Sequence, residues 1–390
     1  MRRLALALLW PALLAGCSLG DDNSGRPPQL GVNQDDDQAA AKLGFPSSAT
    51  RNTVRVGGAD AAADAAGVAS ALYPATGSSD RPTAVVLVDD DDWQSAIAAA
   101  VLAGPPIGAP LLVTDDRDLP SVTKQTLDEL QPKGSDLSKD AQVIRIGQGV
   151  ARPDGYRTAV VQGDDPFERA AAIDRFFSAA RGKPSAAVVL YSADAAEWAM
   201  PAASWSARSG DAALPVRKDS IPAATRRALA SHEGADVYLL GPTSVISTRV
   251  ASQLRRRKLA RSVNRIAGKT PIENAIAFTR YEKGDFGWGI VVPGYNFAIA
   301  NTDRPLDVAA AASLATRGVF APLLLTDDAA ELPGPLVSYL LSVQPGYEGD
   351  PAQAVYNRAW ILGDDKAISV DQQARVDATT ELIPVQSNAP

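Results

Sequence analysis

The chain of 390 residues contains one cysteine, Cys17, and one histidine, His232. A single cysteine excludes an intramolecular disulfide and a thiolate metal cluster. The usual zinc sites need several His or Cys ligands, so we expect no metal and no cofactor. A Ser-His-Asp site would have to use His232, but no GxSxG nucleophile motif accompanies it. We interpret His232 as a cation at a predicted helix end, before a capping Gly234.

Positive charge is also scarce. The 38 Lys and Arg face 45 Asp and Glu, and removing Arg2 and Arg3 with a leader takes the net charge from −7 to −9. Nucleic-acid-binding proteins carry a broad basic field, so we expect no nucleic-acid partner. With 46% hydrophobic residues the composition is that of a globular protein, and the length predicts two or three domains.

No run of 18 uncharged apolar residues follows the first 17 positions. Those positions read MRRLALALLWPALLAGC, with a basic start, an apolar stretch from Leu4 to Leu14 and a lipobox-like Leu-Ala-Gly-Cys end. The apolar stretch is too short for a mature transmembrane helix and suits a signal peptide. We predict a signal peptide over residues 1–17 and acylation of Cys17, with a plain secretory signal as the alternative. Anchoring in the lipid bilayer would place the chain on the outer face of the cell membrane.

Residues 18–50 are rich in Asp, Asn, Gly, Pro, Ser and Gln and have no apolar periodicity. This composition predicts a flexible tether.

After residue 50 the sequence repeats with a period of about 105 residues, which predicts α/β repeats over 51–152, 153–260 and 261–390, the last with a C-terminal tail. The first and third copies share the pattern APLLxTDD, and the second is the most diverged. Strands are predicted at 84–88, 108–114 and 143–147, at 186–192, 213–216 and 237–241, and at 290–294, 320–326 and 359–363.

The predicted strands are continuous apolar runs, which is typical of parallel sheets covered by helices on both faces. Their order with intervening helices predicts the α/β class, with three tandem flavodoxin-like units that each hold a small parallel sheet. Open α/β sheets bind ligands beyond the carboxyl ends of their strands. The candidate loop residues at these ends are Asp89, Asp90, Thr114, Asp115, Thr326 and Asp327.

The acidic run Asp89 to Asp92 has two interpretations. Clustered carboxylates suit calcium, but an EF-hand count from Asp89 places Gln94 and Ala100 where Gly and Glu are required. Helix N-capping is the favoured interpretation. The glycines of Gly147-Gln-Gly149 indicate a turn, because a dinucleotide-binding loop needs a third glycine and a following helix.

Several motifs recur in the same order in the copies. The openings are Arg55-Val-Gly-Gly and Arg265-Ile-Ala-Gly, and the later strands are Ala109–Thr114 and Ala321–Thr326. The closing turns begin at Gly147, Gly241 and Gly363. In this order the chain resembles the cell wall binding repeat 2 family over roughly residues 53–372. The resemblance implies three domains around a pseudo-threefold axis and binding of anionic wall polymer in basic grooves between domains. The Arg and Tyr that usually follow the opening glycine are absent, and Ala61 and Ala62 stand there.

One local stretch is basic despite the net charge, and it is the candidate polymer-binding site. Its residues are Arg249, Arg255, Arg256, Arg257, Lys258 and Arg261. A solvated helix face is the alternative interpretation. Five tryptophans could stack on sugars but are expected mainly in the core or between domains: Trp93, Trp198, Trp205, Trp288 and Trp360.

The sequence therefore predicts a monomeric, non-catalytic cell-envelope lipoprotein whose repeats bind cell-wall glycopolymer. A solute-binding lipoprotein that holds a small ligand between domains is the alternative. An envelope hydrolase with paired aspartates is the third possibility, and its carboxylate spacing is visible only in three dimensions.

Overall fold

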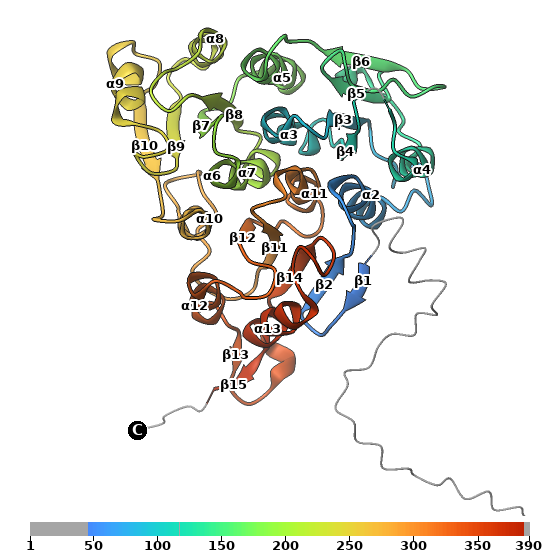
Figure 1. The fold of residues 1–390 in the computed structure, drawn as a ribbon, viewed down its shortest axis with the longest axis vertical. Helices are drawn as coiled ribbons and strands as arrows, with labels where there is room; N and C mark the ends of the chain where they lie inside the picture. The colour runs from blue at the N-terminus through green and yellow to red at the C-terminus, as the bar shows by residue number, and fades with distance from the viewer. Residues whose placement is uncertain (1–45, 117, 386–390) are drawn as a thin grey trace, which may run out of the picture.

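The computed structural model describes residues 46–116 and 118–385. The predicted leader, Cys17 and most of the predicted tether lie outside the described residues. None of the described helices has the length and hydropathy needed to cross a bilayer. The described chain forms three main sheets around a central group of helices, and a small two-stranded sheet near the C-terminus (Figure 1).

The first two sheets have four parallel strands each, in equivalent orders. The first has the order β4-β3-β5-β6 and the second the order β8-β7-β9-β10. The first three strands of each order are almost completely buried, as two covered faces require, and the last strand of each order, at the edge, is only half-buried. The strands are β3 (Val85–Asp89), β4 (Leu111–Thr114), β5 (Val143–Ile146), β6 (Thr158–Val161), β7 (Ala187–Ser192), β8 (Ala212–Val216), β9 (Asp236–Leu240) and β10 (Ser262–Ile266).

The third sheet joins the two ends of the described chain. Its parallel strands have the order β12-β11-β14-β2, and β1 pairs antiparallel with β2 at the edge. The N-terminal β2 therefore takes the place that β6 and β10 hold in the other sheets. The strands are β1 (Pro46–Ala49), β2 (Thr53–Val56), β11 (Asn296–Asn301), β12 (Leu323–Thr326) and β14 (Arg358–Leu362).

The opening strand of each sequence repeat consequently lies in the sheet of the preceding repeat. The strands β6 and β10 leave their own repeats, and β2 pairs with β14 so that Val54 faces Trp360. This exchange closes the three units into a ring. The predicted α/β class with three small parallel sheets is confirmed. Each sheet therefore contains one strand that belongs, in the sequence, to the next repeat. Strand β1 lies within residues 18–50, which were predicted to form the tether.

Alanine-rich helices meet at the centre of the ring (Figure 1). They are α2 (Ala61–Leu72), α3 (Trp93–Ala99) with the 3-10 turn η1 (Ala100–Ala103), α7 (Pro201–Ser209) and α11 (Val308–Leu314). A Cβ on Gly104, after η1, would lie 2.2 Å from the Ala207 carbonyl oxygen of α7. Small side chains allow this close approach, which explains why the chain has so many alanines.

The remaining helices lie between neighbouring units or on the outer faces of the sheets (Figure 1). They are α4 (Ser121–Leu130), α5 (Pro166–Arg181), α6 (Ala196–Ala199), α8 (Ala223–Ser231), α9 (Thr248–Arg256), α10 (Pro271–Arg280), α12 (Gly334–Ser342) and α13 (Val370–Thr380). Short turns η2 (Asp136–Ser138), η3 (Pro305–Asp307) and η4 (Pro351–Gln353) and the pair β13 (Gly346–Tyr347) and β15 (Ile383–Pro384) complete the described elements.

One predicted strand is wrong. Residues 290–294 form an irregular segment, and β11 begins after them at Asn296. Pro293 has no N–H for a sheet, and Gly294 has a φ of 108°, which an extended strand does not allow. Val291 and Val292 are 58% and 53% exposed, so this apolar run faces outward.

Candidate functional site

Five of the predicted polymer-binding cations form one exposed group on α9, here called the α9 basic cluster. Helix α9 begins at a Ser247 cap and buries Val250, Ala251 and Leu254 against the second unit. The cations lie on the exposed surface of α9 and directly after its last residue. They are Arg249, Arg255, Arg256, Arg257 and Lys258, all exposed. Within the part of the chain that the structure describes, none of their side chains forms an ion pair or hydrogen bond.

The position of the cluster has a local cause. Four of its cations lie at the C-terminal end of α9, where the helix dipole and unpaired carbonyls favour positive charge. That effect explains one or two cations, but the run continues past the helix end to Lys258. The surplus charge is available to an external anion.

Arg261 differs from the other predicted cations because it is already paired. Its Nε lies 3.0 Å from Oδ1 of Asp236, and Ser262 Oγ donates to the same oxygen. The hydrogen bond from Arg261 is the main cause that lowers the pKa of Asp236. Arg261 thus secures the start of β10, and we do not include it in the α9 basic cluster.

Three of the predicted loop carboxylates, Asp89, Asp90 and Asp115, lie at the carboxyl edge of the first sheet, whereas Asp327 follows β12 of the third sheet. Asp89 Oδ1 accepts from the Asp116 backbone N–H at 3.3 Å, which brings the two acidic loops together. Partial burial and then neighbouring carboxylates raise the pKa values of Asp89 and Asp90, with Asp115 acting on Asp90. In residues 46–116 and 118–385 no group of three or more His, Cys, Asp or Glu is arranged to hold a metal.

The threonines of the Thr-Asp-Asp turns face inward. Thr114 and Thr326 are fully buried, and their hydroxyls donate to the carbonyl oxygens of Val88 and Asp328. Asp327 is exposed beside Thr326. Asp92, the last acid of the predicted run, caps α3 by accepting from Ser95 N–H at 3.1 Å, so N-capping is confirmed at this position.

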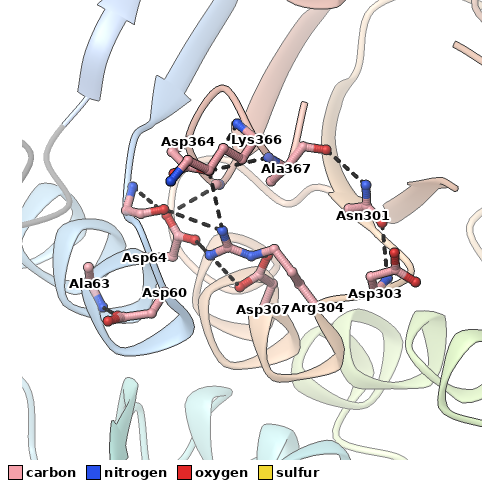
Figure 2. A network of polar contacts seen from close by, with 12 residues as sticks. Asp60, Ala63, Asp64, Asn301, Asp303, Arg304, Asp307, Asp364, Lys366 and Ala367 are labelled. Atoms are coloured by element: carbon pink, nitrogen blue, oxygen red, sulfur yellow. Dashed lines mark hydrogen bonds and ion pairs between the residues drawn. The ribbon is translucent and has the colours of Figure 1, made fainter. Parts of the chain in front are cut away.

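A buried polar network joins the third unit to the first (Figure 2). Arg304 forms ion pairs with Asp64 of α2 and, at 2.9 Å, with Asp307 of η3, and Asp364 lies 3.8 Å away. Both Asp64 and Asp307 are fully buried. Burial raises the pKa of Asp307 to about 6, although Arg304 acts in the opposite direction. Burial and the charge of Asp307 raise the pKa of Asp64 well above its usual value.

Quasi-equivalent contacts join the other units with different chemistry. Asp64, Arg169 and Asn274 occupy matching positions in the opening helices α2, α5 and α10. Arg169 binds Asp92 at 2.7 Å and Ser95 at 2.9 Å, which reverses the charges of the Asp64–Arg304 pair. Asn274 donates to the Trp198 carbonyl at 3.3 Å. These three residues were not among the predicted site residues, although each is a polar residue six positions after the glycine that opens its repeat, Gly58, Gly163 or Gly268.

The single histidine is buried in an ion pair. His232 ends α8, as predicted, and Gly234 has a left-handed φ of 72°. The His232 Nε2 atom lies 2.9 Å from both carboxylate oxygens of Asp174, and its Nδ1 atom lies 3.0 Å from the Ser185 carbonyl oxygen. Burial lowers the pKa of His232, but Asp174 outweighs burial and the pKa is raised. At 2% exposure this imidazole is sealed from a substrate.

The chain was compared with known proteins. No family model matches it, and no curated protein matches it. Two solved structures from Clostridium difficile share its fold at 18% sequence identity. Cwp8 has a TM-score of 0.64 and is aligned over 84% of this chain and 52% of its own. Cwp6 has a TM-score of 0.65 and is aligned over 87% of this chain and 49% of its own. The chain thus spans about half the length of these two proteins.

The charged groups of the other candidate sites among the described residues are mostly buried, mutually repelling or already paired. The close carboxyl pair, Asp64 and Asp307, has no exposed surface for a substrate. The exposed acids of the first sheet edge raise one another's pKa values, and Arg169, the cation that acts on Asp91, is already bound to Asp92. A groove of about 590 Å³ between α10 and α12 contains Lys269, but its Arg280 already contacts Ser342 and the Tyr339 ring. The α9 basic cluster is the strongest candidate for an anion contact.

Proposed function

We propose that this chain is a non-catalytic cell-envelope lipoprotein that binds an anionic wall polymer through the α9 basic cluster. The leader and lipobox support export and anchoring through Cys17. The ordered motifs that resemble cell wall binding repeat 2, together with the fold shared with the cell wall proteins Cwp8 and Cwp6, support a place at the wall.

The observation that carries the proposal is the set of five exposed cations that have no carboxylate partner among the described residues. A polymer with repeated phosphates or carboxylates brings several anions to such a group at once. Each exposed ion pair contributes about 0.2–1 kcal/mol and is weakened by salt, so the total is a few kcal/mol and salt-dependent. Guanidinium groups add paired, directional hydrogen bonds to phosphate or carboxylate oxygens.

Retention of the soluble form, residues 18–390, on purified wall sacculi tests this proposal. We expect retention that needs the anionic polymer of the sacculi and that falls as salt rises. Replacing Arg255, Arg256 and Arg257 by Ala should reduce retention at least tenfold. Replacing the same residues by Lys should preserve much of it, because the charge remains.

The control variant removes three exposed cations elsewhere, Arg152, Lys183 and Lys366, and changes the net charge equally. It should bind like the unaltered chain. Equal losses in both variants would show that only the net charge matters and would contradict the α9 site. Retention on sacculi stripped of anionic polymer would contradict the proposed ligand.

Anchoring is tested separately in cells. We expect Cys17→Ser to abolish labelling with a fatty-acid analogue and to move the protein out of the membrane fraction. The variant should keep its affinity for sacculi, since the α9 basic cluster is unchanged. A Cys17→Ser protein that still takes up the label and sediments with membranes would contradict lipid attachment at this residue.

A further inference from the structure

The loop between α10 and β11, residues 281–295, is three times as long as its counterpart in the second unit, residues 182–186. Phe286 anchors it: this ring is buried and stacks on Tyr238 with the ring centroids 3.4 Å apart. Gly287 has a φ of 106°, and a Cβ there would lie 2.1 Å from the Tyr281 carbonyl oxygen. The loop is therefore held in one conformation by its own packing.

This loop forms one wall of a cavity of about 430 Å³ between the second and third units. That volume lies within the range of roughly 300–1,000 Å³ that is common for small-ligand sites. Aromatic side chains from both units surround it: Trp205 of α7, Trp288 and Tyr295 of the loop, and Phe320 before β12. The rings of Trp205 and Trp288 meet edge to face at 5.6 Å and fix each other.

Two of these rings, Tyr295 and Phe320, are partly exposed to solvent instead of being buried in the core. Tyr295 is 39% and Phe320 is 45% exposed. The backbone of Phe320 has a φ of 53°, a left-handed conformation that is unfavourable for a bulky residue. Strain of this kind concentrates at binding sites. The Arg208 guanidinium lies 4.8 Å from the centre of the Phe320 ring and holds it from one side.

Some polar groups of the cavity are hydrogen-bonded and others are not: Ser209 and the Trp205 indole N–H have partners at Trp205 O and Asp211. Arg208 and Asp285 both line it, and neither side chain forms an ion pair or hydrogen bond with another described residue. The indole N–H of Trp288 likewise has no acceptor among residues 46–116 and 118–385. The lining therefore offers one anionic acceptor, several N–H donors and ring faces, with no net charge.

We propose that this aromatic cavity is a binding site for a neutral saccharide. The ring of a sugar presents apolar C–H groups that stack on aromatic faces, and its hydroxyls need both acceptors and donors. Asp285 accepts from hydroxyls, and Arg208 and Trp288 donate to them. The balanced charge disfavours the polyanion proposed for the α9 basic cluster, so the two sites take different ligands. This inference does not rest on that proposed function.

Saturation-transfer NMR and tryptophan fluorescence with maltotriose, cellotriose and tri-N-acetylchitotriose test the site on residues 18–390. We expect at least one trisaccharide to bind and to change the tryptophan emission, with little dependence on salt, and a Trp288→Phe variant should lose most of that change. Phe320→Ala and Asp285→Asn should each weaken this binding about tenfold, since each removes a stacking or charged hydrogen-bond contact. Glucose and N-acetylglucosamine are tested as single-ring probes. Their affinities show whether the cavity binds a free monosaccharide or requires a longer saccharide.

Matched controls are Leu341→Ala, a 50% exposed residue of α12, and Glu331→Gln, an exposed acid, both outside the cavity lining. Their affinities should equal that of the unaltered chain, and the Arg255, Arg256 and Arg257 variant should also bind saccharide normally. The proposal is overturned if no saccharide in the panel binds below about 10 mM, or if the cavity variants bind as tightly as the controls. Loss of saccharide binding in the α9 variant would also overturn it.

Discussion

The opening glycines show most directly how single residues determine the repeat. A Cβ added to Gly58, Gly163 or Gly268 would lie 2.2–2.5 Å from a backbone nitrogen of the following helix. The three positions recur with the sequence period. Each helix therefore begins directly over the end of the strand before it, and no larger side chain fits.

We predict that Gly268→Ala lowers the free energy of unfolding by about 2–4 kcal/mol, because the added methyl group overlaps the Asn274 and Glu273 backbone. Gly149→Ala is the control, since no atom lies within 4 Å of its added Cβ. Denaturant unfolding of both variants measures the difference. Equal free energies of unfolding for the two variants would show that the start of α10 shifts to accommodate the methyl group without loss of stability.

Sequence analysis identified the opening motif and the capping role of acids, because caps depend on neighbours along the chain. It could not identify the roles of Asp64, Arg169 and Asn274. Their partners lie in other units and carry no spacing signal, as the Asp64–Arg304 contact between residues 240 positions apart shows. The cavity residues could not be predicted from the sequence for the same reason, because Arg208, Asp285 and Phe320 are brought together only by folding.

At the scale of elements, the contacts between units use different charges at matching positions. Between α2 and the third unit the helix supplies an acid, and between α5 and the first unit the helix supplies a base. Between α10 and the second unit the helix supplies an amide. Exchanging helices would place like charges together or leave a buried charge unpaired, which costs several kcal/mol. The contacts thus favour one order of units around the ring.

The carboxyl pair at the first of these contacts predicts a pH dependence of stability. Asp307 has a pKa of about 6 in the folded chain, above the unfolded value of 3.8. Its contribution is therefore complete below about pH 4 and is lost as the pH rises through 6. The free energy of unfolding should fall by on the order of 2–3 kcal/mol over this interval.

Asp307→Asn, which mimics the protonated acid, should reduce that fall, and the raised pKa of Asp64 accounts for the part that remains. The control is Asp303→Asn, an exposed neighbour that should leave the dependence unchanged. Denaturant midpoints at pH 4, 5, 6 and 7 provide the measurement. A parallel pH profile for Asp307→Asn and the unaltered chain would contradict the account of this contact.

Most predicted elements agree with the structure because long apolar runs and alanine-rich helices are strong local patterns. The strand predicted at 290–294 is the exception. Its valines resemble a buried strand, but anchoring of the loop by Phe286 shifts β11 toward the C-terminus and leaves them exposed. The hydropathy of residues 290–294 alone does not show that they belong to the long loop between α10 and β11.

At the scale of the whole molecule, the ring closes where β2 joins β14. Arg55 of β2 is 3% exposed and reaches four groups near the C-terminus: the carbonyls of Gly363, Asp364 and Ser369 and the Gln373 side chain. The sequence predicted three similar units but not this exchange. An apolar run in the sequence predicts that a segment forms a β-strand. It does not predict which of three similar sheets the strand joins.

We predict that Arg55→Met destabilises the third sheet by about 3–5 kcal/mol, because several buried carbonyls lose their donor. Hydrogen exchange should increase in both β2 and β14. Arg265→Met is the matched control. Arg265 is the equivalent arginine of β10, and it donates to the carbonyl oxygens of Gly241 and Ile246, which are close to it in the sequence and belong to the same unit. Its effect should stay within the second sheet. Unchanged exchange in β14 of Arg55→Met would contradict closure by this side chain.

The wall-binding proposal is tested most directly by the salt dependence of affinity for purified anionic wall polymer. On a logarithmic plot of affinity against salt, residues 18–390 should give a steep negative slope, because several cations meet the polymer at once. The variant without Arg255, Arg256 and Arg257 should give a clearly shallower slope and bind at least tenfold more weakly at low salt. The same slope and affinity for both proteins would contradict polymer binding by the α9 basic cluster.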